Sequence, residues 1–128
     1  MMGIDMMTDA YAELFRSLRD PVLVVDEHNR LVETNPAATE LLKIAPSGMG
    51  GADIRETLES FPRLADAIEK GVSSEIDVGS YWGVKHFRTE ISDITGQNER
   101  VIGKVVIMRD ITKQKRLEKE ISRKTAAP

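Results

Sequence analysis

The sequence predicts a single domain of the α+β class, in which an antiparallel sheet carries its helices on one face. Two short apolar runs near the start form a predicted hairpin, and three longer strand patterns follow each other near the end with short connections. Short helical patterns separate the two groups of strands. Strands with short connections favour antiparallel pairing, and helices grouped between them collect on one face of the sheet. We expect a flanking helix in residues 1–19, the domain in 20–112 and the start of a linker helix in 113–128.

The composition narrows the classes of function. The chain has 128 residues, the size of one domain, with 41% hydrophobic and 30% charged residues. Its net charge of −3 gives no basic field, so we expect no nucleic-acid partner. The absence of cysteine excludes disulfides, Cys-ligated zinc and cysteinyl-flavin photochemistry within this chain. With no apolar run of the ~20 residues that cross a bilayer and no signal-peptide pattern, we expect a cytoplasmic domain without direct membrane insertion, within a parent protein that is cytoplasmic or membrane-anchored.

The first predicted element is a helix that Thr8 caps and Pro21 ends, with residues 1–7 frayed before it. Apolar residues recur on it at helical spacing, namely Tyr11, Leu14, Phe15 and Leu18. This stripe has two interpretations that the sequence leaves open. The helix packs on the body of the domain, or it pairs with the same helix of a second copy.

A hairpin and a short helix follow. Residues 22–25 and 31–34 read as its two strands, with a polar turn between them. Asn35 precedes Pro36, and asparagine caps a helix that proline opens. The helix covers residues 37–43, with Leu41 and Leu42 facing inward.

The middle of the chain combines a loop with two helical segments. Residues 45–52 are rich in glycine and proline and predict a loop. Residues 53–59 form a short helical turn with Ile54 and Leu58 on one side, and Pro62 opens a second helix that Gly71 ends.

The end of the chain predicts three strands and an exit helix. The strands cover residues 74–78, 84–94 and 100–109, and the helix covers 113–124, with disorder from Thr125 onward. Almost no loop separates the last strand from the helix. Asp110 and Thr112 flank this junction, where a carboxylate and a hydroxyl cap the first amides of a helix and set how rigidly it follows the sheet.

Four motifs in this order carry a resemblance to a known family. They are Asp20-Pro21-Val22-Leu23-Val24-Val25-Asp26, Asn35-Pro36-Ala37-Ala38-Thr39-Glu40-Leu41-Leu42, the hairpin from Asp93 to Gly103, and Asp110-Ile111-Thr112. Together they resemble the PAS domain family. The resemblance implies a profilin-like sheet of five antiparallel strands in the order 2-1-5-4-3, with short helices on one face and flanking helices at both ends.

The resemblance also implies a function. It indicates a sensory module that senses a small ligand or mediates dimerisation, and that relays a signal through its C-terminal helix to a downstream domain of the same chain. A histidine kinase of a two-component system is the expected effector, and a homodimer through the flanking helices is the expected assembly. The alternatives are a ligand-free dimerisation module and a profilin-like adaptor. We expect no enzyme activity in this chain, because the hydrolase, Walker and zinc-protease motifs are absent.

PAS-like domains can hold a ligand between the sheet and the helices, and the residues expected near such a pocket follow from this. They are Leu23, Val25, Leu58, Phe61, Leu64, Ile68, Tyr81, Trp82, Phe87, Ile91 and Ile107. Their apolar character favours a small apolar or aromatic ligand. We expect no haem, because the helix Pro62–Lys70 contains no histidine, and no metal, because the two histidines are far apart. Plain packing is the alternative for the pocket residues, and Asn35, Asp110 and Thr112 are the predicted signal-relay residues.

Overall fold

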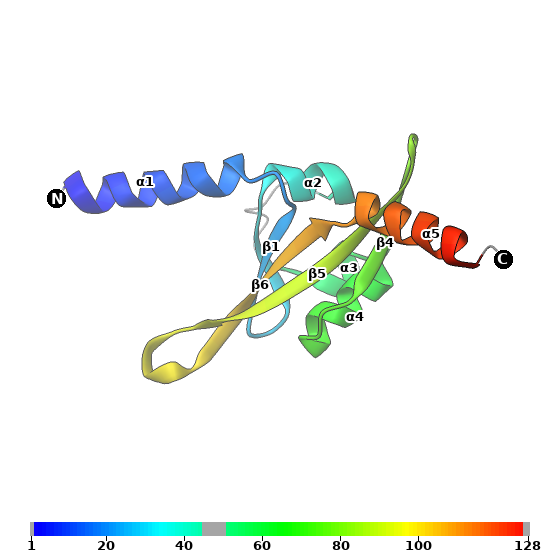
Figure 1. Ribbon diagram of the computed structural model, residues 1–128. Coiled ribbons are helices and arrows are strands. Elements are labelled where there is room, and N and C mark those ends of the chain that lie inside the picture. Colours follow the sequence, from blue (N-terminus) through cyan, green and yellow to red (C-terminus); the bar gives the residue numbers. More distant parts are fainter. Residues whose placement is uncertain (1, 45–50, 127–128) are drawn as a thin grey trace.

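The computed structural model describes residues 2–44 and 51–126, which form one curled antiparallel sheet with helices on one side and at both ends (Figure 1). The sheet order is β3-β2-β1-β6-β5-β4. The elements are α1 (Met2–Ser17), β1 (Val22–Asp26), β2 (Arg30–Thr34), α2 (Pro36–Leu42), β3 (Ala52–Asp53), α3 (Ile54–Thr57), α4 (Pro62–Lys70), β4 (Glu75–Ser80), β5 (Gly83–Thr95), the 3₁₀ turn Gln97–Glu99, β6 (Val101–Asp110) and α5 (Thr112–Ala126).

The prediction of five strands in the order 2-1-5-4-3 is wrong in the number of strands, because the sheet has six. A sixth strand, β3, pairs with Arg30 and Leu31 at the outer edge of β2, so the full order differs from the predicted one. Two residues are too few to show the alternation that identifies a strand, and Ala52 fell within the predicted loop. The five strands that the sequence predicts do follow each other as β2-β1-β6-β5-β4. The rest of that loop, residues 45–50, lies outside the described residues.

Both terminal helices are longer than predicted. Helix α1 begins at Met2, so the prediction of a frayed start and an N-cap at Thr8 is wrong, because methionine is a good helix former and threonine is tolerated inside a helix. It ends at Ser17, before the proline. Helix α5 continues through Thr125 to Ala126, where disorder was expected. The last two residues lie outside the described part.

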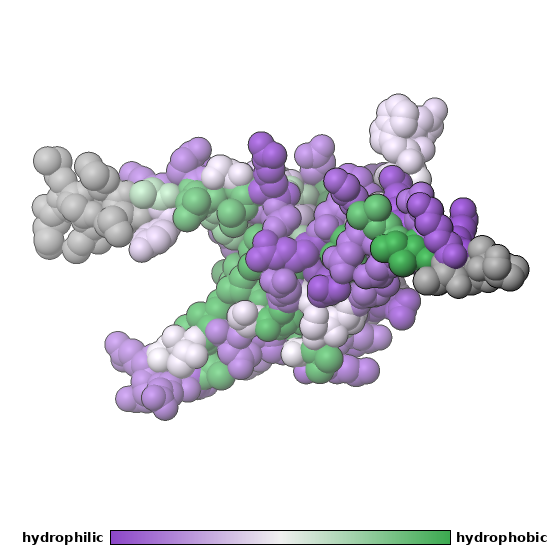
Figure 2. All heavy atoms as spheres, viewed as in Figure 1, coloured by the Kyte–Doolittle hydropathy of each residue, from purple (hydrophilic) through white to green (hydrophobic). Residues whose placement is uncertain are grey.

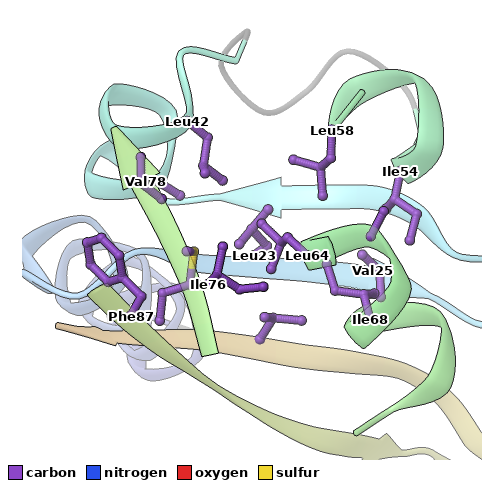
Figure 3. Close-up of a cluster of buried hydrophobic side chains, with 14 residues drawn as sticks. Leu23, Val25, Leu42, Ile54, Leu58, Leu64, Ile68, Ile76, Val78 and Phe87 are labelled. Carbon is purple, nitrogen blue, oxygen red and sulfur yellow. The ribbon is translucent and has the colours of Figure 1, made fainter. Parts of the chain in front are cut away.

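The core lies between one face of the sheet and helices α2, α3 and α4 (Figure 3). Alternate residues of each strand point to this face, as the period of a strand requires. The strands contribute Leu23, Val25, Ile76, Val78, Phe87, Val106 and Met108. The helices and the turn after α3 contribute Ala38, Leu42, Ile54, Leu58, Leu64, Ala65 and Ile68.

Local chemistry fixes the helix ends as the sequence indicates. Asn35 caps α2, and Pro36 is its first residue. Pro62 opens α4, and Gly71 ends it with φ 65°, a left-handed conformation that glycine adopts without a steric penalty.

The two central strands approach each other closely at Gly103. This residue is paired with Asp26, and a Cβ atom placed on it would overlap the carbonyl oxygen of Val25. The glycine therefore permits the contact between β1 and β6, which connect the two ends of the chain to the sheet.

Three segments project from the body (Figure 1). Helix α1 extends to one side, the far end of the β5–β6 hairpin extends below it, and the tip of the β4–β5 hairpin extends beyond α2 and α5. Figure 2 shows apolar surface on the sides of α1 and of the long hairpin that face the open space between them.

Candidate functional site

The last strand and the exit helix are joined by one residue. Strand β6 ends at Asp110 and α5 begins at Thr112, so Ile111 alone lies between them, and it is only 7% exposed. The backbone N–H of Ile111 donates to the carbonyl oxygen of His86 in β5 at 2.8 Å. Its own carbonyl accepts from the N–H of Lys115 at 2.9 Å, the first turn of the helix. The junction is thus both short and buried.

Thr112 and Asp110 close this junction with their side chains. The Thr112 hydroxyl accepts a hydrogen bond from the N–H of His86 at 2.9 Å, and the Asp110 carboxylate accepts one from the N–H of Thr112 at 2.9 Å. Burial tends to raise the pKa of Asp110, but the hydrogen bonds from Thr112, together with the nearby Lys85 and His86, hold this pKa below its ordinary value. The start of α5 is therefore attached to β5 through backbone and side chain together.

One ion pair and one histidine–carboxylate hydrogen bond extend the attachment to the edge strand β4. Lys115 Nζ lies 2.7 Å from a carboxylate oxygen of Glu75, and His86 Nδ1 lies 2.6 Å from a carboxylate oxygen of Asp77. The hydrogen bond between Lys115 and Glu75 lowers the pKa of the carboxyl and raises that of the amine. The first turn of α5 is thus attached to both β4 and β5.

Asn35 organises the other side of the same end of the sheet. Its side-chain oxygen accepts from the N–H groups of Val22 at 2.9 Å and Ala38 at 3.0 Å, and its amide donates to the carbonyl of Asp20 at 2.8 Å. The Asp20 carboxylate pairs with Arg109 of β6 at 2.7 Å. One fully buried amide therefore connects the incoming chain, β1 and α2, and Asp20 continues the connection to β6.

The predicted pocket residues fall into three groups. Eight lie in the core or against it, with Phe61 and Ile91 only partly buried; they are Leu23, Val25, Leu58, Phe61, Leu64, Ile68, Phe87 and Ile91. Ile107 alternates with the buried Val106 and Met108, so it lies on the opposite face of the sheet from the core, where it was not expected. Tyr81 and Trp82 are 92% and 89% exposed in the turn between β4 and β5.

A groove of about 490 Å³ opens beside the junction, between α2 and the β4–β5 hairpin. Its lining includes the apolar side chains of Leu41, Val78 and Phe87, together with Trp82 and Asp110. Of the predicted pocket residues, Tyr81, Trp82 and Phe87 line it. The groove brings an apolar surface next to the carboxylate that caps α5.

Two properties of the described part concern cofactors and membranes. Residues 2–44 and 51–126 contain no group of three or more His, Cys, Asp or Glu side chains arranged to hold a metal ion. None of the described helices is both long enough and apolar enough to cross a membrane.

Comparison with known proteins identifies the family. The PAS fold matches residues 9–111, most of the chain. The chain belongs to the PAS family. This PAS domain is 23% identical over 115 residues to the cyclic di-GMP phosphodiesterase PdeB of Shewanella oneidensis strain MR-1, a match that covers 84% of the chain and 13% of that protein.

Solved structures agree in fold. The structure of an RNA-binding light-oxygen-voltage receptor superimposes with a TM-score of 0.70 and 18% identity, over 96% of this chain and 38% of that one. A sensory box sensor histidine kinase from Vibrio cholerae superimposes with a TM-score of 0.53 and 17% identity, over 86% of this chain and 96% of that one. The PAS domain spans only a small part of the curated relative and about two fifths of the receptor chain.

Sequence reasoning missed the partners that attach α5 to the sheet. They are Glu75, Asp77, His86 and Lys115. Each is an ordinary polar residue in its own segment, and no spacing along the chain connects them. They meet because β4 and β5 pair with Asp77 opposite His86, a register that no local pattern specifies.

Proposed function

We propose that this PAS domain is a sensory module that relays a change in its sheet through α5 to an effector domain of the same protein. One observation carries the proposal, namely the attachment of the first turn of α5 to β5 and β4 across a junction of a single buried residue. A helix held in this way moves with the strands rather than independently of them. The proposed relay residues are Asn35, Asp110 and Thr112, with His86 as the point where β5 contacts the junction.

The groove beside the junction supports a ligand-sensing step. A small apolar or aromatic molecule on Val78 and Phe87 would contact β4 and β5 and lie beside Asp110. Its binding energy favours one position of these strands over another, which is the requirement for a shift between two states. Because α5 is attached directly to these strands, no other segment has to change position for the relay.

The effector is proposed to be a signalling enzyme. A curated relative is a cyclic di-GMP phosphodiesterase of which this domain matches 13%, and a structural neighbour is a sensor histidine kinase. Both support a PAS domain that regulates catalysis elsewhere in a larger cytoplasmic or membrane-anchored protein. A histidine kinase and a cyclic di-GMP enzyme are distinguished by assaying the full-length protein for each activity.

The experiment replaces Thr112 with valine and Asp110 with alanine in the full-length protein and measures effector output with and without stimulus. We expect the difference between the two output states to shrink by roughly 10-fold, on the scale of an allosteric coupling of 1–3 kcal/mol. The control is Gln114→Ala in the first turn of α5, whose side-chain amide donates to the carboxylate of Glu118 in the same helix at 3.2 Å. An unchanged response in the double variant, with the domain still folded, would refute the relay.

Dimerisation is a second candidate function, supported by the surface of α1 and of Leu18 directly after it. Tyr11, Leu14 and Leu18 are 64%, 58% and 41% exposed, so the interpretation that this stripe packs on the body does not hold for them. Exposed apolar stripes at helical spacing are typical of helix pairing. Sedimentation of wild type and of Leu14→Glu tests this role. A dimer that dissociates more readily in the variant supports it, and equal association in both contradicts it.

A further inference from the structure

The tip of the β4–β5 hairpin presents two aromatic rings to solvent. Tyr81 and Trp82 form an edge-to-face pair with centroids 5.1 Å apart, and each is about nine-tenths exposed. Figure 1 shows this tip standing clear of α2 and α5, and Figure 2 shows it as a separate protrusion. The Ser80 hydroxyl donates to the Gly83 carbonyl at 2.8 Å and closes the turn. The rings are therefore held on a fixed turn rather than on a long loop.

Trp82 lines a groove on each side of the hairpin. One is the groove beside α2 described above, and the other, of about 450 Å³, lies between the hairpin and the start of α5. The half-exposed Val84 adds apolar surface to the second groove. Exposed tryptophan and tyrosine next to concave surface are the residues that contribute most to protein interfaces.

The charge of the second groove is opposite to that of the chain. Lys85, Lys113 and Arg116 line it, and in the described part of the chain none of the three has an ion pair within 4.0 Å. Lys85 is near enough to Asp110 for its charge to lower the pKa of that carboxyl. Its one carboxylate, Asp110, accepts a hydrogen bond from the Thr112 amide. The whole chain carries a net charge of −3. The cations are thus concentrated beside the exposed tryptophan.

We propose that this surface binds an acidic segment of a partner protein that carries an apolar side chain. The apolar side chain packs on Trp82 and Val84, and the carboxylates of the segment pair with Lys85, Lys113 and Arg116. Charge complementarity selects the partner, and the aromatic ring supplies the apolar contact. The proposal concerns binding alone and does not depend on the relay through α5.

Two other classes of partner fit the surface less well. A flat membrane surface would contact the protruding hairpin tip. It would not reach the cations, because they line a groove that includes the start of α5. A nucleic acid presents a phosphate at every nucleotide and needs a continuous basic track. Here Glu118 and Glu120 interrupt the cations of α5, and Lys115 is paired with Glu75.

The chain provides its own reporter for the test, because Trp82 is its single tryptophan. A random-peptide display library is selected against the purified domain, and the enriched peptides are titrated while tryptophan emission is recorded. We expect enriched peptides with net negative charge and at least one apolar anchor, a shift of emission to shorter wavelength, and weaker binding at higher salt. Phosphatidylserine–phosphatidylcholine vesicles and a single-stranded RNA are titrated in parallel, and we expect neither to shift the emission.

Paired charge reversals locate the site. Lys85→Glu with Lys113→Glu should weaken the binding of enriched peptides by about 10-fold or more, as for close charge pairs at interfaces. Lys119→Glu with Lys124→Glu changes the net charge equally on an exposed part of α5 and should leave binding within about 2-fold, since exposed charges contribute little. Enrichment of neutral or basic peptides, equal losses in both double variants, or an emission shift only with vesicles or RNA would overturn the proposal. So would the absence of any enriched peptide.

Discussion

At the scale of single residues, Asn35 connects three segments of the chain with one side chain. Its amide is fully buried and satisfies two backbone N–H groups and a carbonyl from three segments of the chain. Buried polar groups that lose a partner retain the full cost of their desolvation. The stability of this end of the sheet therefore depends on one side chain.

Replacing Asn35 with alanine should lower the free energy of unfolding by about 2–4 kcal/mol, because a helix cap is lost and buried backbone groups are left unpaired. Equilibrium unfolding in urea measures the change. Gln97→Ala in the exposed 3₁₀ turn is the control, expected within about 0.5 kcal/mol of wild type. A similar small change in both variants would show that the Asn35 contacts are not formed in solution.

Replacing each of two buried threonines, Thr89 and Thr34, with valine should change the free energy of unfolding in opposite directions. The Thr89 hydroxyl donates to the Ser74 carbonyl at 3.0 Å and accepts from the Ser74 amide at 2.9 Å. The Thr34 hydroxyl oxygen is buried and has no hydrogen-bond partner among the described residues. We expect Thr89→Val to cost about 1–3 kcal/mol and Thr34→Val to be neutral or stabilising by about 1 kcal/mol.

Thermal and urea unfolding of the two variants test this pair, and each serves as the control for the other because the change of atoms is identical. A loss of stability in Thr34→Val as large as in Thr89→Val would show that the Thr34 hydroxyl is satisfied in solution.

The sequence allowed some of these residues to be placed and not others. The cap at Asn35 follows from its position before Pro36, but the bond to Asp20 depends on the path of the chain after α1. Ile107 shows a second limit. Residues 101–108 are almost wholly apolar, so alternation does not identify which set faces the core. That is decided by the pairing of β6 with β1 and β5, which places Val106 and Met108 inward.

At the scale of elements, long strands and capped helices were predictable and the edge of the sheet was not. The bounds of α4 follow from Pro62 and Gly71, and β5 and β6 follow from their length and apolar content. Strand β3 exists because Arg30 and Leu31 offer it a partner, which is information about a distant part of the chain. The junction between β6 and α5 is predictable as a short connection, but its attachment to β4 and β5 is not.

The cap of α5 should make stability depend on pH in the acid range. The pKa of Asp110 is lower in the folded protein than its ordinary value of 3.8. At a pH above 3.8 the ionised carboxylate therefore stabilises the folded state. This contribution disappears as the pH falls through the lower pKa of the folded state. We expect wild type to exceed Asp110→Asn in stability by about 0.5–1 kcal/mol near neutral pH. The difference should shrink in acid below the ordinary pKa.

Urea unfolding of both proteins across this range measures the difference, and Asp93→Asn, an exposed carboxyl on β5, is the matched control. A difference between wild type and Asp110→Asn that stays constant from neutral to strongly acid pH would contradict a charged cap.

At the scale of the whole molecule, α1 lies outside the unit that the core holds together. The core cluster draws on β1, β4, β5 and β6 and on the helical segments from α2 to α4, and none of its members comes from α1. The helix is followed by Leu18 and Asp20, whose carbonyls accept from Asn35, so the connection to the body begins after it.

Deleting residues 1–17 should therefore change the free energy of unfolding of the monomer by less than about 1 kcal/mol, while it weakens any dimer that the apolar stripe forms. Urea unfolding at low protein concentration measures the first effect, and sedimentation equilibrium measures the second. Leu64→Ala in the core is the reference variant, and we expect it to lower the free energy of unfolding by about 2–5 kcal/mol. If deleting residues 1–17 lowered the free energy of unfolding as much as Leu64→Ala does, α1 would belong to the cooperatively folding unit.

The chain enters and leaves the sheet on neighbouring strands at one end, where the Met108 amide donates to the Pro21 carbonyl and Val22 lies opposite Ile107. Tension applied through the two terminal helices would open β1 from β6 like a zipper, one hydrogen bond after another, instead of shearing all of them together. A domain connected in this way offers little resistance to being pulled apart by its neighbours, and Asn35 and the Asp20–Arg109 pair stand at the first bonds that such a force would break.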